Sequence, residues 1–297
     1  MKRTIISMAL CVLGLQLSAQ SMSFLNINPD AAASAVANTA VARPADAYAI
    51  QNNTAAAALS ESRMAVSAGY AIWQPKAIKT GVVSAAGFYR IGEKFAIAAD
   101  LKNFTEPEYQ IASADGRSAG MFAPKEIAAA LGVSYKIGDS FSIGLNAKFA
   151  NSVLAETAKA STVAADVSLA YAKNGFQAGL AVANIGGKVK YGEGDGYALP
   201  TIVRAGAAYS IVGLTASAEI DYLLSGGFMA GLGAEYWIVD IVAVRAGFHY
   251  GDPEKAIPTY ASVGLGAKFS GVSLNATYLL ASKTIGGTLM FGLGYSF

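Results

Sequence analysis

From Leu289 to the C-terminus, the chain alternates strictly between large apolar and small side chains. The large set consists of Leu289, Phe291, Leu293, Tyr295 and Phe297. Of the intervening positions, Gly292, Gly294 and Ser296 are small and only Met290 is not. A period of two predicts a β-strand whose two faces meet different surroundings. A greasy face opposite a face of small residues is typical of a transmembrane barrel strand, whose outer side meets lipid.

The composition of the chain argues against a soluble domain and against transmembrane helices. Hydrophobic residues make up 54% of the chain and charged residues only 14%, with a mean hydropathy of +0.39. Soluble domains usually carry about a quarter charged residues. After the N-terminus, the sequence has no apolar run of about eighteen residues, which a spanning helix needs. Because only helices and closed barrels satisfy the backbone in lipid, transmembrane strands remain.

Residues 1–19 are predicted to be a secretory signal peptide that directs the chain to the outer membrane of a Gram-negative cell. Lys2 and Arg3 precede an apolar stretch, and Ser18 and Ala19 resemble a cleavage site. Cys11, the one cysteine, lies inside this segment, so the mature chain is predicted to have no disulfide or thiol chemistry. Removing Lys2 and Arg3 balances the remaining basic and acidic residues. This neutrality argues against a nucleic-acid partner.

Residues 20–60 differ from the rest of the mature chain. They are rich in alanine, the best helix former, and Asp30 and Thr54 are suitable N-cap residues. We therefore predict a short, partly helical segment that either plugs a barrel lumen or lies across its periplasmic mouth. Residues 61–297 are predicted to form the barrel itself.

Fourteen alternating segments follow, which predicts an all-β fold, a 14-stranded antiparallel transmembrane β-barrel. The segments are 63–73, 80–90, 93–103, 126–137, 139–150, 161–172, 175–184, 199–210, 212–223, 227–238, 240–250, 258–269, 271–281 and 286–297. The connections after even-numbered segments are very short, and those after odd-numbered segments are generally longer, up to 104–125. Bacterial barrels have short periplasmic turns, longer outer loops and an even strand number. This parity places the start of the first strand and the end of the last strand both on the periplasmic side.

The alternation also predicts which side chains face lipid. In 139–150, large residues such as Leu145 point outward and polar ones such as Ser142 and Lys148 point inward. An arginine at Leu145 is therefore expected to be costly, and one at Ser142 nearly silent. Segment 80–90 leaves two choices open, with either Val82 or Val83 facing out. The outer loops other than 104–125 are expected to be short.

Charged residues and the single histidine recur on the predicted inner face of four successive strands. They are Arg204, Glu219, Asp221, Glu235, Arg245 and His249. One interpretation is a charged constriction that selects solutes. The other is an internal ion-pair network that fills a narrow lumen, because buried charges are usually paired. His249 has no adjacent serine, so we expect no catalytic site, and no metal or other cofactor.

The N-terminal segment resembles the opening of the PorV/PorQ family of outer-membrane proteins from Bacteroidetes. The resemblance rests on Asn28-Pro29-Asp30-Ala31, on Asp46-Ala47 and on Asn53-Thr54-Ala55, where Thr54 replaces the proline usual in the family. It implies a barrel like that of the FadL fatty-acid transporters. It also implies a non-enzymatic role in type IX protein secretion or surface attachment, which relies on outer loops. A FadL-like or porin-like channel for small or hydrophobic solutes is the alternative.

The expected partners follow from these resemblances. Tyr295 and Phe297, at the end of the last strand, resemble the signal by which the barrel assembly machinery recognises outer-membrane barrels. Outer-membrane lipid is expected around the barrel. The family resemblance adds secreted cargo or secretion-system proteins.

Overall fold

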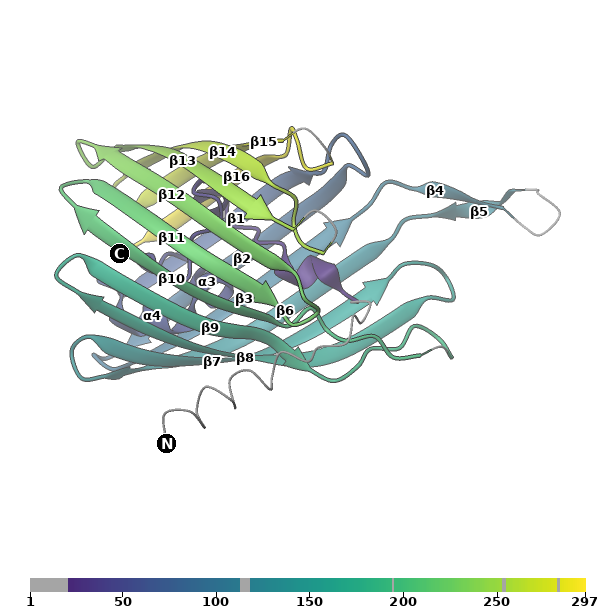
Figure 1. The fold of residues 1–297 in the computed structure, drawn as a ribbon, viewed down its shortest axis with the longest axis horizontal. Helices are drawn as coiled ribbons and strands as arrows, with labels where there is room; N and C mark the ends of the chain where they lie inside the picture. Colours follow the sequence, from purple (N-terminus) through teal and green to yellow (C-terminus); the bar gives the residue numbers. More distant parts are fainter. Residues whose placement is uncertain (1–20, 113–117, 194, 253–254, 282–283) are drawn as a thin grey trace.

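The fold is described from a computed structural model that covers residues 21–112, 118–193, 195–252, 255–281 and 284–297. The predicted signal peptide lies outside these residues and remains a prediction. Fourteen antiparallel strands form a closed barrel, in which the first strand pairs with the last. Figure 1 shows the strands strongly tilted around the barrel. Within the described residues, no helix is both long enough and apolar enough to cross a membrane.

The predicted barrel is confirmed, with one strand in each of the predicted segments. The barrel strands are β1 (Met64–Trp73), β2 (Thr80–Ile91), β3 (Phe95–Thr105), β6 (Lys125–Ile137), β7 (Phe141–Val153), β8 (Lys159–Lys173), β9 (Phe176–Gly186), β10 (Ile202–Ile211), β11 (Leu214–Leu223), β12 (Phe228–Ile238), β13 (Val242–Gly251), β14 (Tyr260–Phe269), β15 (Val272–Leu280) and β16 (Leu289–Ser296). The short connections all lie at one end, which we call the turn rim. The longer ones lie at the other end, the loop rim. Phe297 is at the turn rim, where its carbonyl accepts hydrogen bonds from the Arg63 and Met64 amides at 2.7 and 3.0 Å.

The outer surface of the barrel is apolar because alternate side chains of each strand point away from the lumen. The ambiguity in β2 is resolved: Val83 is 55% exposed on the outside, whereas Val82 is 2% exposed inside. Leu145 also faces out. The expectation for Ser142 is wrong, because its inner-face position is covered. Ser142 is 1% exposed and donates a hydrogen bond to the Ala55 carbonyl at 2.7 Å, so an arginine cannot fit there without displacing the luminal segment.

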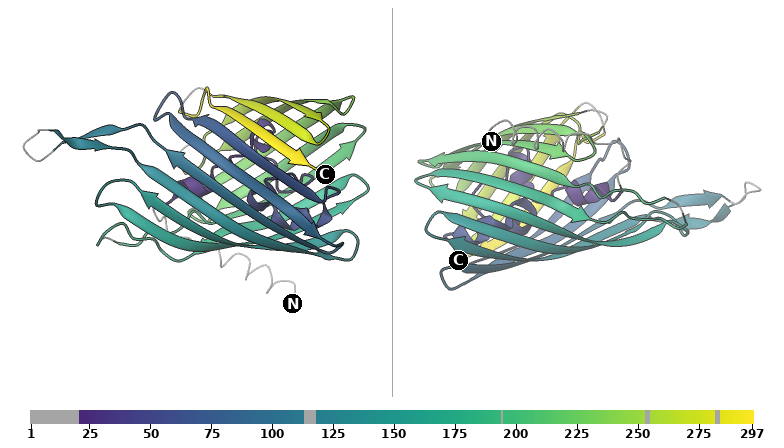
Figure 2. Two further views of the ribbon diagram at one scale, coloured as in Figure 1. Left: turned by 180° about the vertical axis from the view of Figure 1, so that it is seen from behind. Right: turned by 60° about the horizontal axis from the view of Figure 1, so that its bottom comes forward.

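A two-stranded hairpin extends the connection between β3 and β6. It consists of β4 (Tyr109–Ala112) and β5 (Ser118–Phe122), which pair only with each other. Figures 1 and 2 show it reaching well beyond the loop rim. This loop was predicted to be the longest, but no strands were predicted in it. Strands of four and five residues are too short for their alternation to be recognised.

Residues 21–59 lie inside the barrel, and we call them the luminal segment (Figures 1 and 2). Its helices are η2 (Ser23–Asn26), α2 (Ala31–Ala35), α3 (Ala49–Asn52) and α4 (Thr54–Leu59). Asp30 caps α2 as expected, by accepting from the Ala32 amide at 2.8 Å. The cap of α4 is Asn53, not Thr54, because the Asn53 side chain accepts from the Ala55 amide, leaving Thr54 as the first helical residue. Helices this short are not stable alone, so packing against the barrel wall must hold them.

Candidate functional site: the barrel lumen

An apolar cluster fills the lumen toward the loop rim. Met22, Phe24 and Leu25 of the luminal segment contribute to it, and each is buried. The Phe24 ring packs edge-on against Phe104 of β3, with ring centroids 5.4 Å apart. Other members come from the ends of strands and from loops around the barrel, namely Trp73, Val82, Leu199, Tyr260, Leu279, Ile285 and Met290. Met22, Phe24 and Leu25, at the start of the luminal segment, therefore form a hydrophobic plug at this end, which we call the stopper.

Lys102 on β3 holds this part of the luminal segment in place. Its side chain is fully buried, and Nζ donates to the carbonyls of Leu25 at 2.9 Å and Ile27 at 3.2 Å. Nζ also lies 3.4 Å from Gln51 Oε1, while Gln51 Nε2 donates to Asp100 on the same strand. Asp100 and Lys102 were not among the residues predicted from the sequence. Their alternation with the apolar outward residues of 93–103 was the available signal.

A buried ion pair lies between β7 and β8. Lys148 Nζ is 2.8 Å from Asp166 Oδ2, and it also donates to Asn184 Oδ1 at 3.0 Å. Asn184 in turn donates to Asn26 Oδ1 at 2.7 Å, which connects the pair to the luminal segment. Lys148 was predicted to face inward, but Asp166 was not identified. Charged residues inside the barrel therefore lie on more strands than the predicted lumen charge cluster covers.

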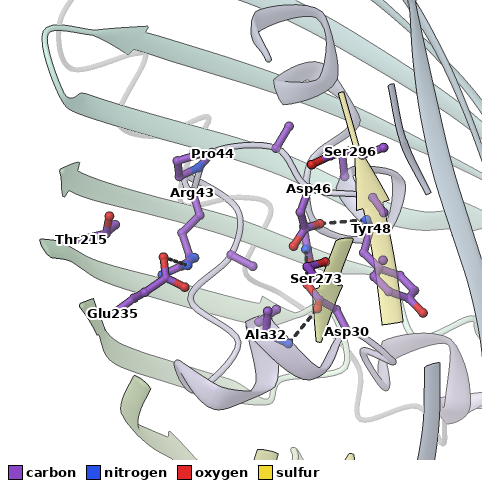
Figure 3. Close-up of a pocket in the computed structure, with 18 of the residues that line it drawn as sticks. Asp30, Ala32, Arg43, Pro44, Asp46, Tyr48, Thr215, Glu235, Ser273 and Ser296 are labelled. Carbon is purple, nitrogen blue, oxygen red and sulfur yellow. Dashed lines mark hydrogen bonds and ion pairs between the residues drawn. The ribbon is translucent and has the colours of Figure 1, made fainter. Parts of the chain in front are cut away.

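Two members of the predicted lumen charge cluster, Glu235 of β12 and Arg245 of β13, contact each other. Arg245 Nε donates to Glu235 Oε2, and Arg43 from the luminal segment forms an ion pair with Oε1 at 2.9 Å (Figure 3). Arg245 Nη1 also donates to Asn275 Oδ1 at 2.8 Å, and its guanidinium lies over the Trp237 ring. Glu235 is thus shared between the wall and the luminal segment.

The other four predicted residues lie in two separate places. Arg204 is opposite Asp221 in the β10–β11 ladder, and Glu219 follows on the same face. Glu219 accepts a hydrogen bond from the Val41 amide at 2.8 Å, and Arg204 Nη1 lies 3.4 Å from the Gln51 carbonyl. His249 stacks on Tyr260 instead, with ring centroids 4.7 Å apart.

This arrangement bears on the two interpretations of the cluster. A selective constriction needs charges that converge on an open path. Here the charged groups contact the luminal segment through Arg43, Val41 and Gln51. The geometry fits an internal network that holds this segment, and either role remains a prediction. Among the described residues, no group of three His, Cys, Asp or Glu side chains is placed to hold a metal ion.

The motif residues of the N-terminal segment bond to one another across its length. Asn28 accepts from the Asp30 amide at 3.0 Å and donates to Asn52 Oδ1 at 2.7 Å, while Asn52 donates back to Asp30 at 3.1 Å. Asn53 donates to the carbonyls of Val41 and, on the wall, Leu169. The motif thus ties the start of the luminal segment to its end.

Pro29 and Asp46 complete the motif. Pro29 is buried beside Asp30. Asp46 accepts from the Tyr48 amide at 2.8 Å, which shapes the turn before α3, and its carboxyl lies near that of Asp30 (Figure 3). The negative charge of the neighbouring Asp30 carboxyl raises the pKa of Asp46 above its usual value, against the opposing effects of the Tyr48 amide and Arg43.

Two solvent-accessible cavities lie under the luminal segment, toward the turn rim. One, of about 470 Å³, is bordered by Asp30, Arg43, Asp46 and Glu235 together with the ends of β10, β11 and β16 (Figure 3). The other, of about 570 Å³, lies between residues 41–45, 59–62 and 170–178. The lumen is therefore polar and accessible toward the turn rim, and apolar and filled toward the loop rim.

Comparison with solved structures identifies the class of barrel. The Ralstonia pickettii toluene transporter TbuX is similar with a TM-score of 0.68 and 13% identity, covering 93% of this chain and 99% of its own. A Pseudomonas aeruginosa FadL homologue gives 0.57 and 14%, covering 90% and 95%. The monoaromatic hydrocarbon channel CymD gives 0.64 and 13%, covering 93% and 98%. At these identities the likeness shows the fold, which is the FadL-like outer-membrane barrel.

Sequence comparison gives the family. Residues 16–224 match the family model described as type IX secretion system protein PorV, and the chain belongs to this family. The predicted resemblance is therefore confirmed, and with it an outer-membrane barrel associated with type IX secretion. Neither this family nor the FadL-like transporters is a family of enzymes. None of the curated protein sequences matches the chain significantly.

Proposed function

We propose that this barrel serves type IX secretion by contacting secreted cargo or secretion-system proteins at its loop rim, without enzymatic activity and with its lumen closed. The family match is the observation that carries this proposal. Two structural features support it. The luminal segment fills the barrel toward the loop rim, and the β4–β5 hairpin projects beyond that rim.

The hairpin has the properties of a protein-contact element. Tyr109 and Phe122 pack against each other across it, with ring centroids 5.8 Å apart, and Met121 is 58% exposed. Tyr109 also donates to the Leu154 carbonyl in the neighbouring loop at 3.2 Å. An isolated pair of strands exposes unpaired backbone groups along both edges, where a further strand can add. Exposed apolar side chains beside such edges favour a protein partner.

The remaining proposed partners concern how the barrel reaches and occupies the membrane. The apolar outer face of the strands is the surface that we propose to meet outer-membrane lipid. Tyr295 on the closing strand and Phe297 directly after it are exposed, as suits recognition by the barrel assembly machinery. Delivery through a cleaved signal peptide at residues 1–19 belongs to the same proposal.

Shortening the hairpin tests the proposed contact. The Glu106 amide donates to the Pro124 carbonyl at 3.1 Å, so residues 107–123 can be replaced by Asn-Gly while the β3–β6 pairing is kept. We expect barrel levels in the outer membrane to be unchanged and the amount of type IX cargo at the cell surface to fall. A matched variant replaces 155–157, in the next loop, by Asn-Gly and should leave cargo display intact. Normal display by the hairpin variant would contradict the proposal.

A channel for hydrophobic solutes is the second candidate. The apolar cluster around Phe24 and Phe104 supports it, because a greasy site of this kind suits an apolar ligand. The likeness to toluene transporters concerns the fold only. Solute passage would need the stopper to leave its place and break the Lys102 hydrogen bonds. Conductance of the intact protein separates the two candidates.

A further inference from the structure

Four connections at the turn rim contain two consecutive residues with positive φ. Three of them are two-residue hairpin loops, for which type I′ turns are suited, and the β12–β13 loop has a third residue, Ile241. The pairs are Asn174-Gly175, Val212-Gly213, Val239-Asp240 and Ser270-Gly271. Asn-Gly is the preferred sequence for such a turn. Valine is a poor choice, because a β-branched residue is strained at positive φ.

The two valines also gain nothing from packing in return for this strain. Val212, with φ of 42°, is 92% exposed, and Val239, with φ of 47°, is 79% exposed. The same chain uses asparagine at the equivalent position 174, with φ of 52°. An apolar side chain in a strained and exposed position suggests a function outside the folded chain.

These side chains lie together on one part of the rim. We define the rim patch as Val212, Val239, Ile241 and Phe269, all of them exposed. Hydrogen bonds join neighbouring turns, from the Trp237 amide to Gly213 at 2.9 Å and from the Lys268 amide to Ile241 at 2.8 Å. The turn tips of the opposite half of the rim carry polar residues, namely Glu93, Lys94, Asp139, Lys173 and Asn174, although Ile91 and Ile137 beside those turns are also exposed. Apolar side chains at the turn tips themselves, Val212 and Val239, therefore lie on one side of the rim.

The position of the rim patch favours a protein over lipid. Tyr209 and Tyr236 lie on the outer face of β10 and β12, where exposed aromatics mark the membrane interface. Val212 and Val239 follow each of them by three residues, beyond that girdle, at the turn tips. Residues 211–213 and 238–241 contain no lysine or arginine to bind lipid headgroups, and Asp240 is their one charge. Lys268, next to Phe269, is exposed but borders the cavity on the luminal side.

A second copy of the chain is a poor fit to the rim patch. Stable symmetric interfaces bury roughly 800 Å² on each partner, which a few turn tips cannot supply. Protruding tips are complementary to a concave surface. We propose that the rim patch docks in an apolar groove of a periplasmic protein that carries a basic group opposite Asp240. This interaction is additional to the proposed secretion role and does not depend on it.

Cysteine labelling tests this docking. Cys11 lies in the predicted signal peptide, so Val212→Cys places a single thiol in the mature chain. Asn174→Cys is the matched control, because it occupies the same turn position in the polar half of the rim. Labelling by a water-soluble maleimide is measured in outer-membrane envelopes from native cells and in lipid discs holding one purified copy in the same lipids.

We expect Val212→Cys to react roughly tenfold more slowly in envelopes than in discs, as when a partner occupies about nine-tenths of the copies. The control should react equally in both. Equal fast labelling of Val212→Cys in both preparations would overturn the proposal. Slow labelling in both would also overturn it, since lipid would then cover the site, and so would an equal slowing of the control.

A second variant separates docking from folding. Val212→Asn combined with Val239→Asn restores residues that accept positive φ, so the barrel should fold at least as well. Protection of an Ile241→Cys thiol in envelopes should be present in the parent background and lost in this double variant. If protection survives the double substitution, the two valines do not form the docking surface.

Discussion

At the scale of single residues, the lumen is held by a few buried polar side chains that reach the luminal segment. Lys102 donates to two of its carbonyls, and Glu235 binds Arg43. A buried donor that loses its partners, or carbonyls that lose their donor, cost much more than the hydrogen bond itself contributes. These residues are therefore the points where small changes should loosen the luminal segment.

Replacing Lys102 by methionine should loosen the start of the luminal segment. The change keeps most of the side-chain volume and leaves the carbonyls of Leu25 and Ile27 without their donor. We expect a loss of roughly 1–3 kcal/mol in the free energy of unfolding, with faster amide exchange in residues 21–30. Urea unfolding in liposomes and hydrogen exchange measure the two effects. Lys94→Met, at an exposed turn, is the control, and equal effects of both changes would contradict the assigned role.

Asp46 should make stability depend on pH. Because its folded-state pKa is raised, the folded state binds the proton more tightly than the unfolded chain, so stability is fully present below the unfolded pKa of about 4. It is then lost as pH rises toward the folded pKa. Asp46→Asn removes this dependence, so the wild type should weaken relative to the variant as pH rises above about 4. Urea midpoints at matched pH values measure the difference, and a constant offset would refute the assignment.

Among single residues, the sequence predicted those that follow from alternation and missed those that depend on the luminal segment. Leu145 and Lys148 take their predicted faces because strand geometry alone decides them. Ser142 was misjudged, since no pattern in residues 20–60 shows where α4 packs. Asp166 was missed although it lies on an alternating strand. The prediction considered only charged residues that recur on several successive strands.

At the scale of elements, strands and turns follow different rules. Strand faces are set by lipid and lumen, whereas turn residues are set by backbone conformation. Both rules give predictions that do not depend on the proposed function.

The lipid-facing side of β7 should reject charge. Leu145→Arg places a guanidinium in the apolar band, and we expect a loss of roughly 2–4 kcal/mol in the free energy of unfolding if the site is near the bilayer midplane. Leu145→Ile, which keeps the side chain apolar, should change little. Unfolding in liposomes measures both. A cost for arginine no larger than that for isoleucine would overturn the assignment of this face.

The turn between β10 and β11 should become more stable when its valine is replaced. Val212→Asn relieves the left-handed strain, and we expect a gain of about 1 kcal/mol in the free energy of unfolding. Asn174→Val makes the reverse change in the turn between β8 and β9 and should cost a similar amount. If Val212→Asn destabilises the barrel, the valine is not strained.

The strands were predictable because a barrel repeats one pattern fourteen times, so errors in any one segment are corrected by the others. The β4–β5 hairpin has no such support, being short and outside the barrel. The cap of α4 shifted from Thr54 to Asn53 because both residue types can cap, and only the position of the helix start decides between them.

At the scale of the whole molecule, the barrel combines a polar, accessible half with a filled, apolar half. The sequence predicted the barrel and its family but left open whether residues 20–60 enter the lumen or cover its mouth. That choice depends on complementarity between the segment and the wall, as in the contacts of Arg43 and Asn53. The alternation of side chains along the sequence does not predict such contacts.

The most direct test of the closed lumen is single-channel conductance in planar bilayers, measured for the intact mature protein and for a variant lacking residues 21–59. The folded state of each is first checked by its heat-shifted mobility on gels. We expect no steady conductance from the intact protein and steady conductance from the truncated one. Steady conductance from the intact protein would contradict the closed lumen and favour a solute channel. A folded but silent truncated variant would show that the luminal segment is not what closes the barrel.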